Sequence, residues 1–142
     1  PANVADQAFV DAGLGGALKN AGQPAGIYEP EWSKFKVSTL RNVDARPYPG
    51  FVKAYGHNGF FKSLEGIVHF YNTRDVLPRC PEPGGIPYTE SQALAAGCWP
   101  APEYEPTMNV DELGNLGLSG FEEQALVAFL RTLTDEDGRG HH

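Results

Sequence analysis

Regular helical patterning occupies only three short segments of this chain, and this scarcity limits the folds open to it. The three segments lie near residues 5–20, 63–75 and 120–133, while 17 glycines and 12 prolines interrupt much of the remaining chain of 142 residues. The pattern predicts a mainly α protein with long ordered loops. Three short helices cannot enclose so many loops, so we expect a cofactor or another chain to fill the centre.

The second helical segment, SLEGIVHFYNTRD, is expected to begin after a Ser63 cap. Its apolar residues then follow the i, i+3, i+4, i+7 spacing of a single face: Leu64, Ile67, Val68 and Tyr71. We therefore expect Tyr71 on the buried side, where its phenol needs a protein group, a water or a metal as partner. His69 falls on the opposite face and is expected to point to solvent.

The third segment carries the clearest helix signal. Ser119 followed by Glu122 forms a capping box, and an amphipathic helix is expected over about residues 120–133. The apolar stripe assigned to this helix consists of Phe121, Ala125, Ala128, Phe129 and Leu133. The polar tail after it, about residues 136–142, is expected to be disordered.

Cys80 and Cys98 bracket a loop rich in proline and glycine, CPEPGGIPYTESQALAAGC. A disulfide here would remove roughly 3 kcal/mol of loop entropy from the unfolded state and would imply an oxidising compartment. The alternative is a pair of free thiols. Cys-x-x-Cys spacing is absent, which argues against a zinc site.

Charge and hydropathy exclude several classes of partner. The formal net charge of −7 and the absence of a Lys/Arg run predict no binding to nucleic acid or to an anionic membrane. No apolar run approaches the roughly 20 residues of a membrane helix. The first residues, PANVADQAF, lack the charged and apolar regions of a signal peptide, so we expect any export signal to be removed already or to lie upstream.

Three phrases of the sequence carry a family resemblance when they are taken in order. They are FKVSTLRNV, YGHNGFFKSLEGIVHFYNTRD and NVDELGNLGLSGFEEQALVAFLRTLTD. Together they resemble the C-terminal half of bacterial di-haem cytochrome c peroxidases and their relatives of the MauG type, over roughly residues 5–135. The resemblance implies that residues 1–142 form a single domain, the C-terminal portion of a cytochrome c-like haem domain with its loops packed around a haem. It also implies a periplasmic or otherwise exported protein that meets an electron-donor protein.

The chain departs from that family because it has no Cys-x-x-Cys-His motif for covalent haem attachment. We therefore expect haem c to be carried by another polypeptide, either the N-terminal part of the same protein or a separate subunit. That haem-bearing polypeptide is the expected partner, and the chain is expected to be inactive alone. No catalytic residue is assigned, because the family's peroxide-handling acid belongs to the other domain.

The resemblance gives Tyr71 a role as an axial ligand of haem iron. The peroxidases have a methionine at this position of the helix, and MauG-like proteins have a tyrosine. A phenolate is a hard anionic donor that stabilises ferric iron and lowers the reduction potential. Two alternatives stay open: a core tyrosine that bonds a carbonyl, and ligation by Met108, which precedes the last helix as the axial methionine does in small cytochromes c.

Other site residues follow from the same resemblance. Arg41, in TLRN, matches an arginine beside the haem propionates, and the alternative for it is a surface pair with an acid. His57, in the HxG turn, is expected to contact a propionate or to be a hydrogen-bonded loop histidine. Family members also hold calcium through backbone carbonyls just before this turn. Here an insertion, PYPGFVKA, precedes the turn, and no calcium ligand is identified.

These residues support three functions. The leading one is part of a periplasmic di-haem c-type oxidoreductase, in which this chain supplies the distal ligand and the shielding of one haem during electron transfer to a peroxide-reactive haem. The second is an electron-transfer cytochrome subunit with Met108 as ligand. The third is a haem-free interaction module that keeps the fold.

Overall fold

The computed structural model describes residues 9–135, and these are mainly helical, as the sequence predicts. Within that range there are no strands, and extended segments pair only at three isolated bridges. The described part of the chain also contains no helix that is long and apolar enough to span a membrane. Residues 5–8 of the first predicted helix and the predicted disorder at 136–142 lie outside the described residues. The chain divides into two compact units.

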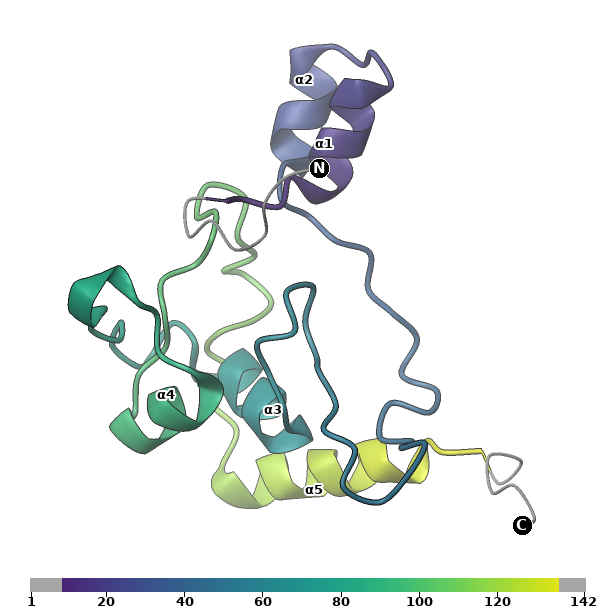
Figure 1. Ribbon diagram of the computed structural model, residues 1–142, viewed down its shortest axis with the longest axis vertical. Helices are drawn as coiled ribbons and strands as arrows, with labels where there is room; N and C mark the ends of the chain where they lie inside the picture. Colours follow the sequence, from purple (N-terminus) through teal and green to yellow (C-terminus); the bar gives the residue numbers. More distant parts are fainter. Residues whose placement is uncertain (1–8, 136–142) are drawn as a thin grey trace. The chain divides into compact units, whose positions relative to one another are not determined.

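The first unit contains residues up to 37 together with 101–109. It is built from helix α1 (Gly13–Asn20), the single turn α2 (Ala25–Tyr28) and the 3-10 turn η1 (Glu29–Glu31), and Figure 1 shows α1 and α2 side by side. Helix α1 contains three glycines, Gly13, Gly15 and Gly16. A β-carbon on Gly15 would come within 2.5 Å of the Cα of Trp32, so the close packing of α1 on η1 requires a glycine there.

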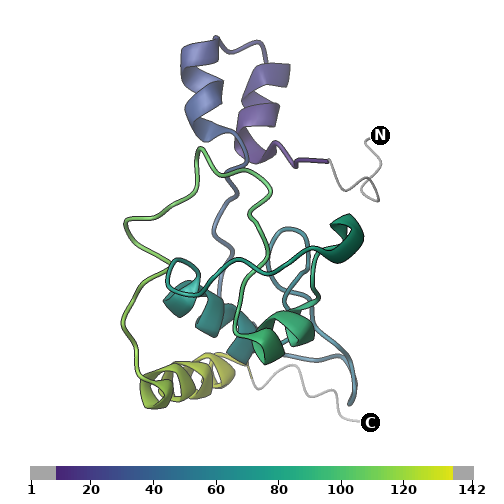
Figure 2. The ribbon, with the colours of Figure 1, turned by 90° about the vertical axis from the view of Figure 1, so that its left-hand side faces the viewer.

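The second unit, residues 38–100 and 110–142, is organised around α3 (Leu64–Thr73). The predicted Ser63 cap is confirmed, since the Ser63 hydroxyl accepts the Gly66 amide at 2.9 Å. Helix α5 (Gly120–Thr132) packs along one side of α3, as both ribbon views show (Figures 1 and 2). The contact between them is an apolar cluster made of Leu64, Val68, Val127 and Leu130.

A second cluster covers another side of α3. Trp99 is fully buried at its centre, and the rings of Phe61 and Phe70 pack against the indole at 6.1 and 5.2 Å between centroids. The disulfide between Cys80 and Cys98 closes this cluster, which confirms the predicted bridge. Aromatic side chains therefore supply much of the core of a unit that has few helices.

Helix α4 (Glu90–Ala96) was not predicted, because its sequence lies within the loop that the cysteines bracket. Its signals are nevertheless present. Thr89 and Gln92 form a capping box, and Gly97 ends the helix with a φ of 63°. The preceding 3-10 turn η2 (Pro83–Gly85) keeps the rest of the loop irregular.

Helix α5 has the expected bounds and the expected cap, but the wrong stripe was assigned to the core. Ser119 and Glu122 form the capping box, and the Ser119 hydrogen bonds lower the pKa of the Glu122 carboxyl. Val127 and Leu130 are buried, whereas Phe121 is 79% exposed and Phe129 56% exposed. Polar contacts explain this orientation of α5. Glu123, on the inner face, is held by Asn72 and His69 of α3, and these contacts set the rotation of the helix.

Candidate functional site

The candidate site lies at the C-terminal end of α3, and both ends of this helix are held firmly. At its start the buried carboxylate of Glu90, from α4, accepts the Ser63 hydroxyl at 2.7 Å and the Lys62 amide at 2.6 Å. A carboxylate at a helix N-terminus also interacts favourably with the helix dipole. Glu90 thus joins α4 to the beginning of α3.

At its end, α3 is fastened to the segment before α5. The Gly114 amide donates to the Tyr71 carbonyl at 2.7 Å, and the Asp75 amide donates to the Gly114 carbonyl at 2.8 Å. The buried guanidinium of Arg74 pairs with Asp75 through two hydrogen bonds and donates a third to the Leu113 carbonyl. This pairing lowers the pKa of the Asp75 carboxyl. The backbone of α3 at Tyr71 and just after it is therefore held by the segment that contains Leu113 and Gly114.

The side chain of Tyr71 does not have the predicted burial. Tyr71 is 41% exposed, although Leu64 and Val68 of the same predicted face are buried. Its ring lies 6.0 Å from that of Phe70, and its hydroxyl has no hydrogen-bond partner among residues 9–135. The prediction of a buried Tyr71 was wrong, because the two apolar clusters that cover α3 use other positions of the helix and neither includes Tyr71.

His69 also differs from its prediction, because its ring is half-buried between α3, α5 and Trp99. The Nδ1 atom lies 3.0 Å from a Glu123 carboxylate oxygen, and the ring centroid lies 5.8 Å from that of Trp99. The same Glu123 oxygen accepts the side-chain amide of Asn72 at 2.5 Å. No local signal in the sequence reveals this cluster, since Glu123 lies 54 residues beyond His69.

Arg41 is in an ion pair near the end of the described chain. Its Nε donates to Asp135 at 2.5 Å, which lowers the pKa of the Asp135 carboxyl, while the Arg41 side chain remains 73% exposed. Asn42, at a φ of 59°, exchanges further hydrogen bonds with Asp135. Within residues 9–135 the two terminal nitrogens of Arg41 have no partner. The surface pair left open by the sequence is present, and it leaves those two donors available.

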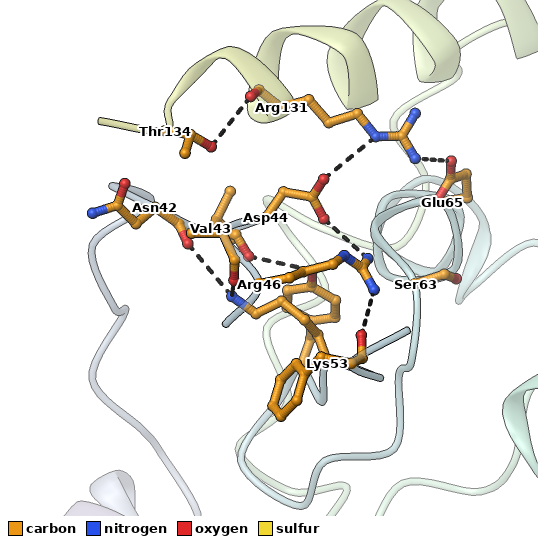
Figure 3. A network of polar contacts seen from close by, with 12 residues as sticks. Asn42, Val43, Asp44, Arg46, Lys53, Ser63, Glu65, Arg131 and Thr134 are labelled. Atoms are coloured by element: carbon orange, nitrogen blue, oxygen red, sulfur yellow. Dashed lines mark hydrogen bonds and ion pairs between the residues drawn. The ribbon is translucent and has the colours of Figure 1, made fainter. Parts of the chain in front are cut away.

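A polar network joins the loop after Arg41 to both main helices (Figure 3). Arg131 of α5 contacts Glu65 of α3 at 2.6 Å and Asp44 at 3.7 Å. The ammonium of Lys53 donates to the carbonyls of Asn42 and Ala45. These contacts hold the segment that precedes the HxG turn against the same α3–α5 pair that carries Tyr71.

One phenol of this unit is held by the network. The Tyr55 hydroxyl donates to the Val43 carbonyl at 3.3 Å. Burial, reinforced by the nearby Asp44 carboxylate, raises the pKa of Tyr55. Tyr55 is thus a half-buried, hydrogen-bonded tyrosine, whereas the Tyr71 hydroxyl has no such bond within residues 9–135.

The remaining predicted site residues are His57 and Met108, which belong to different units. His57 is exposed in a turn that the Tyr55–Phe61 bridge closes, which confirms the predicted turn before α3. Met108, the competing ligand, is half-buried in the first unit, whereas Tyr71 belongs to the second. In the described range the Arg41 guanidinium and the Tyr71 phenol make no direct contact.

The donor atoms of the site suit an axial bond to a haem iron better than a metal ion held by side chains alone. No group of three or more His, Cys, Asp or Glu side chains that could hold a metal ion occurs in residues 9–135. A haem iron needs no such group, because the porphyrin supplies four ligands and the protein adds one or two axial donors. The exposed Tyr71, on a firmly held helix and with no hydrogen-bond partner for its hydroxyl within residues 9–135, fits the role of one axial donor.

Comparison with known proteins gives one relationship. The methylamine utilization protein MauG of Paracoccus denitrificans (strain Pd 1222) is 38% identical to this chain over 112 residues. The chain is a distant relative of MauG. The match covers 78% of this chain but only 25% of MauG, so the chain spans about a quarter of the length of that relative. No protein-family profile matches the chain, and no solved structure matches it.

Proposed function

We propose that this chain is part of a periplasmic di-haem c-type oxidoreductase similar to cytochrome c peroxidase and MauG. In this proposal the chain shields one haem and supplies its distal axial ligand from Tyr71. The haem is attached to a different polypeptide segment, because this chain has no attachment motif. When bound, the haems supply the electron transfer and the peroxide chemistry.

The observation that carries the proposal is the match to MauG over 112 residues, which includes most of this chain. Two structural features support it. The Tyr71 hydroxyl is accessible and has no partner within residues 9–135, although its backbone is rigidly held. In addition, Arg41 keeps two guanidinium donors available, and such a fork suits a haem propionate. His57, exposed in its turn, is proposed as a second propionate contact.

The first experiment asks whether haem accompanies the chain. Native material is separated on a denaturing gel, stained for covalent haem, and each band is weighed by intact mass spectrometry. We expect a haem-staining polypeptide, or a longer form of this chain, to carry the haem. Absence of haem from every band would contradict the proposal and favour a haem-free interaction module.

The second experiment assigns the ligand. In the haem-containing assembly, Tyr71→Met is expected to raise the reduction potential of one haem and to change its ligand-field bands, because a thioether favours ferrous iron more than a phenolate does. Met108→Leu is the matched control and should leave the spectrum unchanged. A near-infrared sulfur-to-iron band that is present in the unsubstituted protein and lost in Met108→Leu would instead assign the ligand to Met108.

A further inference from the structure

The turn between Tyr55 and Phe61 contains the one asparagine of the sequence that is followed by glycine, in the pair Asn58–Gly59. A glycine has no β-carbon to shield its own backbone nitrogen, so this nitrogen can attack the preceding asparagine side chain more readily than that of any other residue. The six other asparagines precede valine, alanine, threonine or leucine. The sequence therefore singles out one side-chain amide for its reactivity.

The fold exposes this pair at the surface and holds its backbone in a defined turn. The Tyr55 amide donates to the Phe61 carbonyl at 2.8 Å, which closes the turn at its base. Asn58 is exposed, and Gly59 has a φ of 67°, in the left-handed region that glycine adopts without strain. Water can therefore reach Asn58 without unfolding of the second unit.

Hydrogen bonds within the turn prepare the Asn58 side chain for attack by the Gly59 nitrogen. The side-chain oxygen of Asn58 accepts the Phe60 amide at 3.1 Å, and the ring that this bond closes contains both atoms that would join, Cγ of Asn58 and the Gly59 nitrogen. The same bond polarises the side-chain carbonyl and places a donor where negative charge develops during the attack.

A second hydrogen bond of the turn opposes the attack, but it is weak. The Gly59 amide donates to the Gly56 carbonyl at 3.3 Å, which is long for such a bond. The bond from the Phe60 amide strengthens as charge develops on the Asn58 oxygen, and it therefore outweighs a long bond between neutral groups.

We propose that Asn58 is a site of spontaneous deamidation through a succinimide formed with Gly59. The Gly59 nitrogen forms a bond to Cγ of Asn58, the bond from Cγ to Nδ2 breaks, and the amide proton of Gly59 leaves with Nδ2 as ammonia. Water then opens the succinimide ring at either of its two carbonyls. The product is aspartate or isoaspartate at position 58, with no change in oxidation state and no co-reactant besides water.

The two products differ in their effect on the turn. An aspartate keeps a side-chain oxygen that can accept the Phe60 amide, and it adds one negative charge to the surface. An isoaspartate leads the backbone through the former side chain and adds a methylene between Tyr55 and Phe61, so the hydrogen bond that closes the turn loses its register. Because α3 begins directly after this turn, we expect the isoaspartate form to be less stable.

Incubation of the isolated protein at neutral pH and physiological temperature tests the proposal. Trypsin cleaves after Lys53 and Lys62 and releases residues 54–62 (AYGHNGFFK), whose three forms are then separated and identified by liquid chromatography and mass spectrometry. The synthetic peptide of the same sequence, which lacks the rest of the fold, is incubated in parallel. We expect conversion in the folded protein at no less than about a tenth of the peptide rate, which corresponds to a barrier at most about 1.4 kcal/mol higher. Conversion at the exposed Asn115, which precedes leucine, should be more than tenfold slower than at Asn58.

A matched variant and two outcomes make the test decisive. Asn58→Gln should remain unconverted over the same period, because its longer side chain closes a ring with the next nitrogen far less readily. A folded-state rate below a tenth of the peptide rate would overturn the proposal, because the turn would then protect its amide. Conversion at Asn115 within tenfold of that at Asn58 would also overturn it.

The effect on the turn is measured separately. The isoaspartate form, isolated by ion exchange and identified by methylation with an isoaspartate methyltransferase, should unfold at a lower temperature than the Asn58→Asp variant. Equal midpoints would contradict the predicted opening of the turn. None of these measurements involves the haem, so their outcome does not depend on the proposed function.

Discussion

The side-chain amide of Asn72 and the backbone of Leu118 form two hydrogen bonds, each 2.9 Å long. Asn72 is buried near the end of α3, and Leu118 immediately precedes the cap of α5. The amide nitrogen of Asn72 also donates to Glu123. One side chain therefore sets both the start of α5 and its rotation on α3.

Replacement of Asn72 by leucine tests this relationship. Asn72→Leu keeps a similar volume but removes three hydrogen bonds, one with the Leu118 amide, one with the Leu118 carbonyl and one with Glu123, so we expect the free energy of unfolding to fall by about 3 kcal/mol. Asn115→Ala, at an exposed position in the same segment, is the control and should change it by less than about 0.5 kcal/mol. Chemical denaturation monitored by circular dichroism gives both values. A similar loss in the two variants would contradict the role given to Asn72.

Substitution of Gly66 in α3 by alanine is expected to lower stability, which is the opposite of the usual effect of this change within a helix. A β-carbon on Gly66 would collide with the Glu90 carboxylate, so Gly66→Ala should destabilise the protein by about 1–3 kcal/mol, although alanine normally favours a helix. Gly120→Ala, where nothing lies within 4 Å, should be neutral or stabilising. Thermal and urea denaturation of both variants provide the comparison. Stabilisation by Gly66→Ala would show that Glu90 does not approach α3 as described.

Two tyrosines of the second unit should differ in their response to loss of the hydroxyl. Tyr55→Phe removes a hydrogen bond to the Val43 carbonyl and should cost about 1 kcal/mol of stability. Tyr71→Phe removes a hydroxyl without a partner within residues 9–135, and should change stability by less than about 0.5 kcal/mol. Urea denaturation of the chain alone distinguishes them. A larger cost for Tyr71→Phe would favour a structural role for this phenol.

Loss of the disulfide should weaken the second unit substantially. A Cys80→Ala/Cys98→Ala variant is expected to be about 3 kcal/mol less stable, because an 18-residue loop is no longer closed in the unfolded chain. These two residues are the only cysteines of the sequence, so titration of thiols in the unfolded, unreduced protein should find none. Two reactive thiols would refute the bridge directly.

The ion pair between Arg74 and Asp75 predicts part of the acid sensitivity. The pKa of the Asp75 carboxyl is lowered in the folded protein, so Asp75 contributes stability at pH values above the ordinary aspartate pKa of about 4. This contribution is lost as the pH falls through the lower folded value. We expect Asp75→Asn to cost on the order of 1 kcal/mol at neutral pH, with the difference from the unsubstituted protein shrinking in acid. Asp111→Asn, at an exposed position, is the control. A difference that does not depend on pH would exclude this ion pair as its cause.

Local signals in the sequence were sufficient for several features. The caps at Ser63 and Ser119 act on amides three residues away, so the starts of α3 and α5 can be read from the order of residues alone. The turn at His57 can likewise be predicted from adjacent residues. The disulfide can be predicted because two cysteines allow only one pairing. The resemblance to MauG-type proteins likewise came from the order of three phrases, and the match to MauG supports it.

Only the tertiary structure decided which faces are buried. The spacing of apolar residues shows that Phe121 and Phe129 share a side of α5, but the bond between Glu123 and Asn72 turns that side outward and Val127 inward. The same long-range packing leaves Tyr71 half-exposed and draws His69 against Trp99. Periodicity determines which residues lie together on a helix, whereas burial depends on partners that are distant in the sequence, and here some of those partners are expected to lie outside this chain.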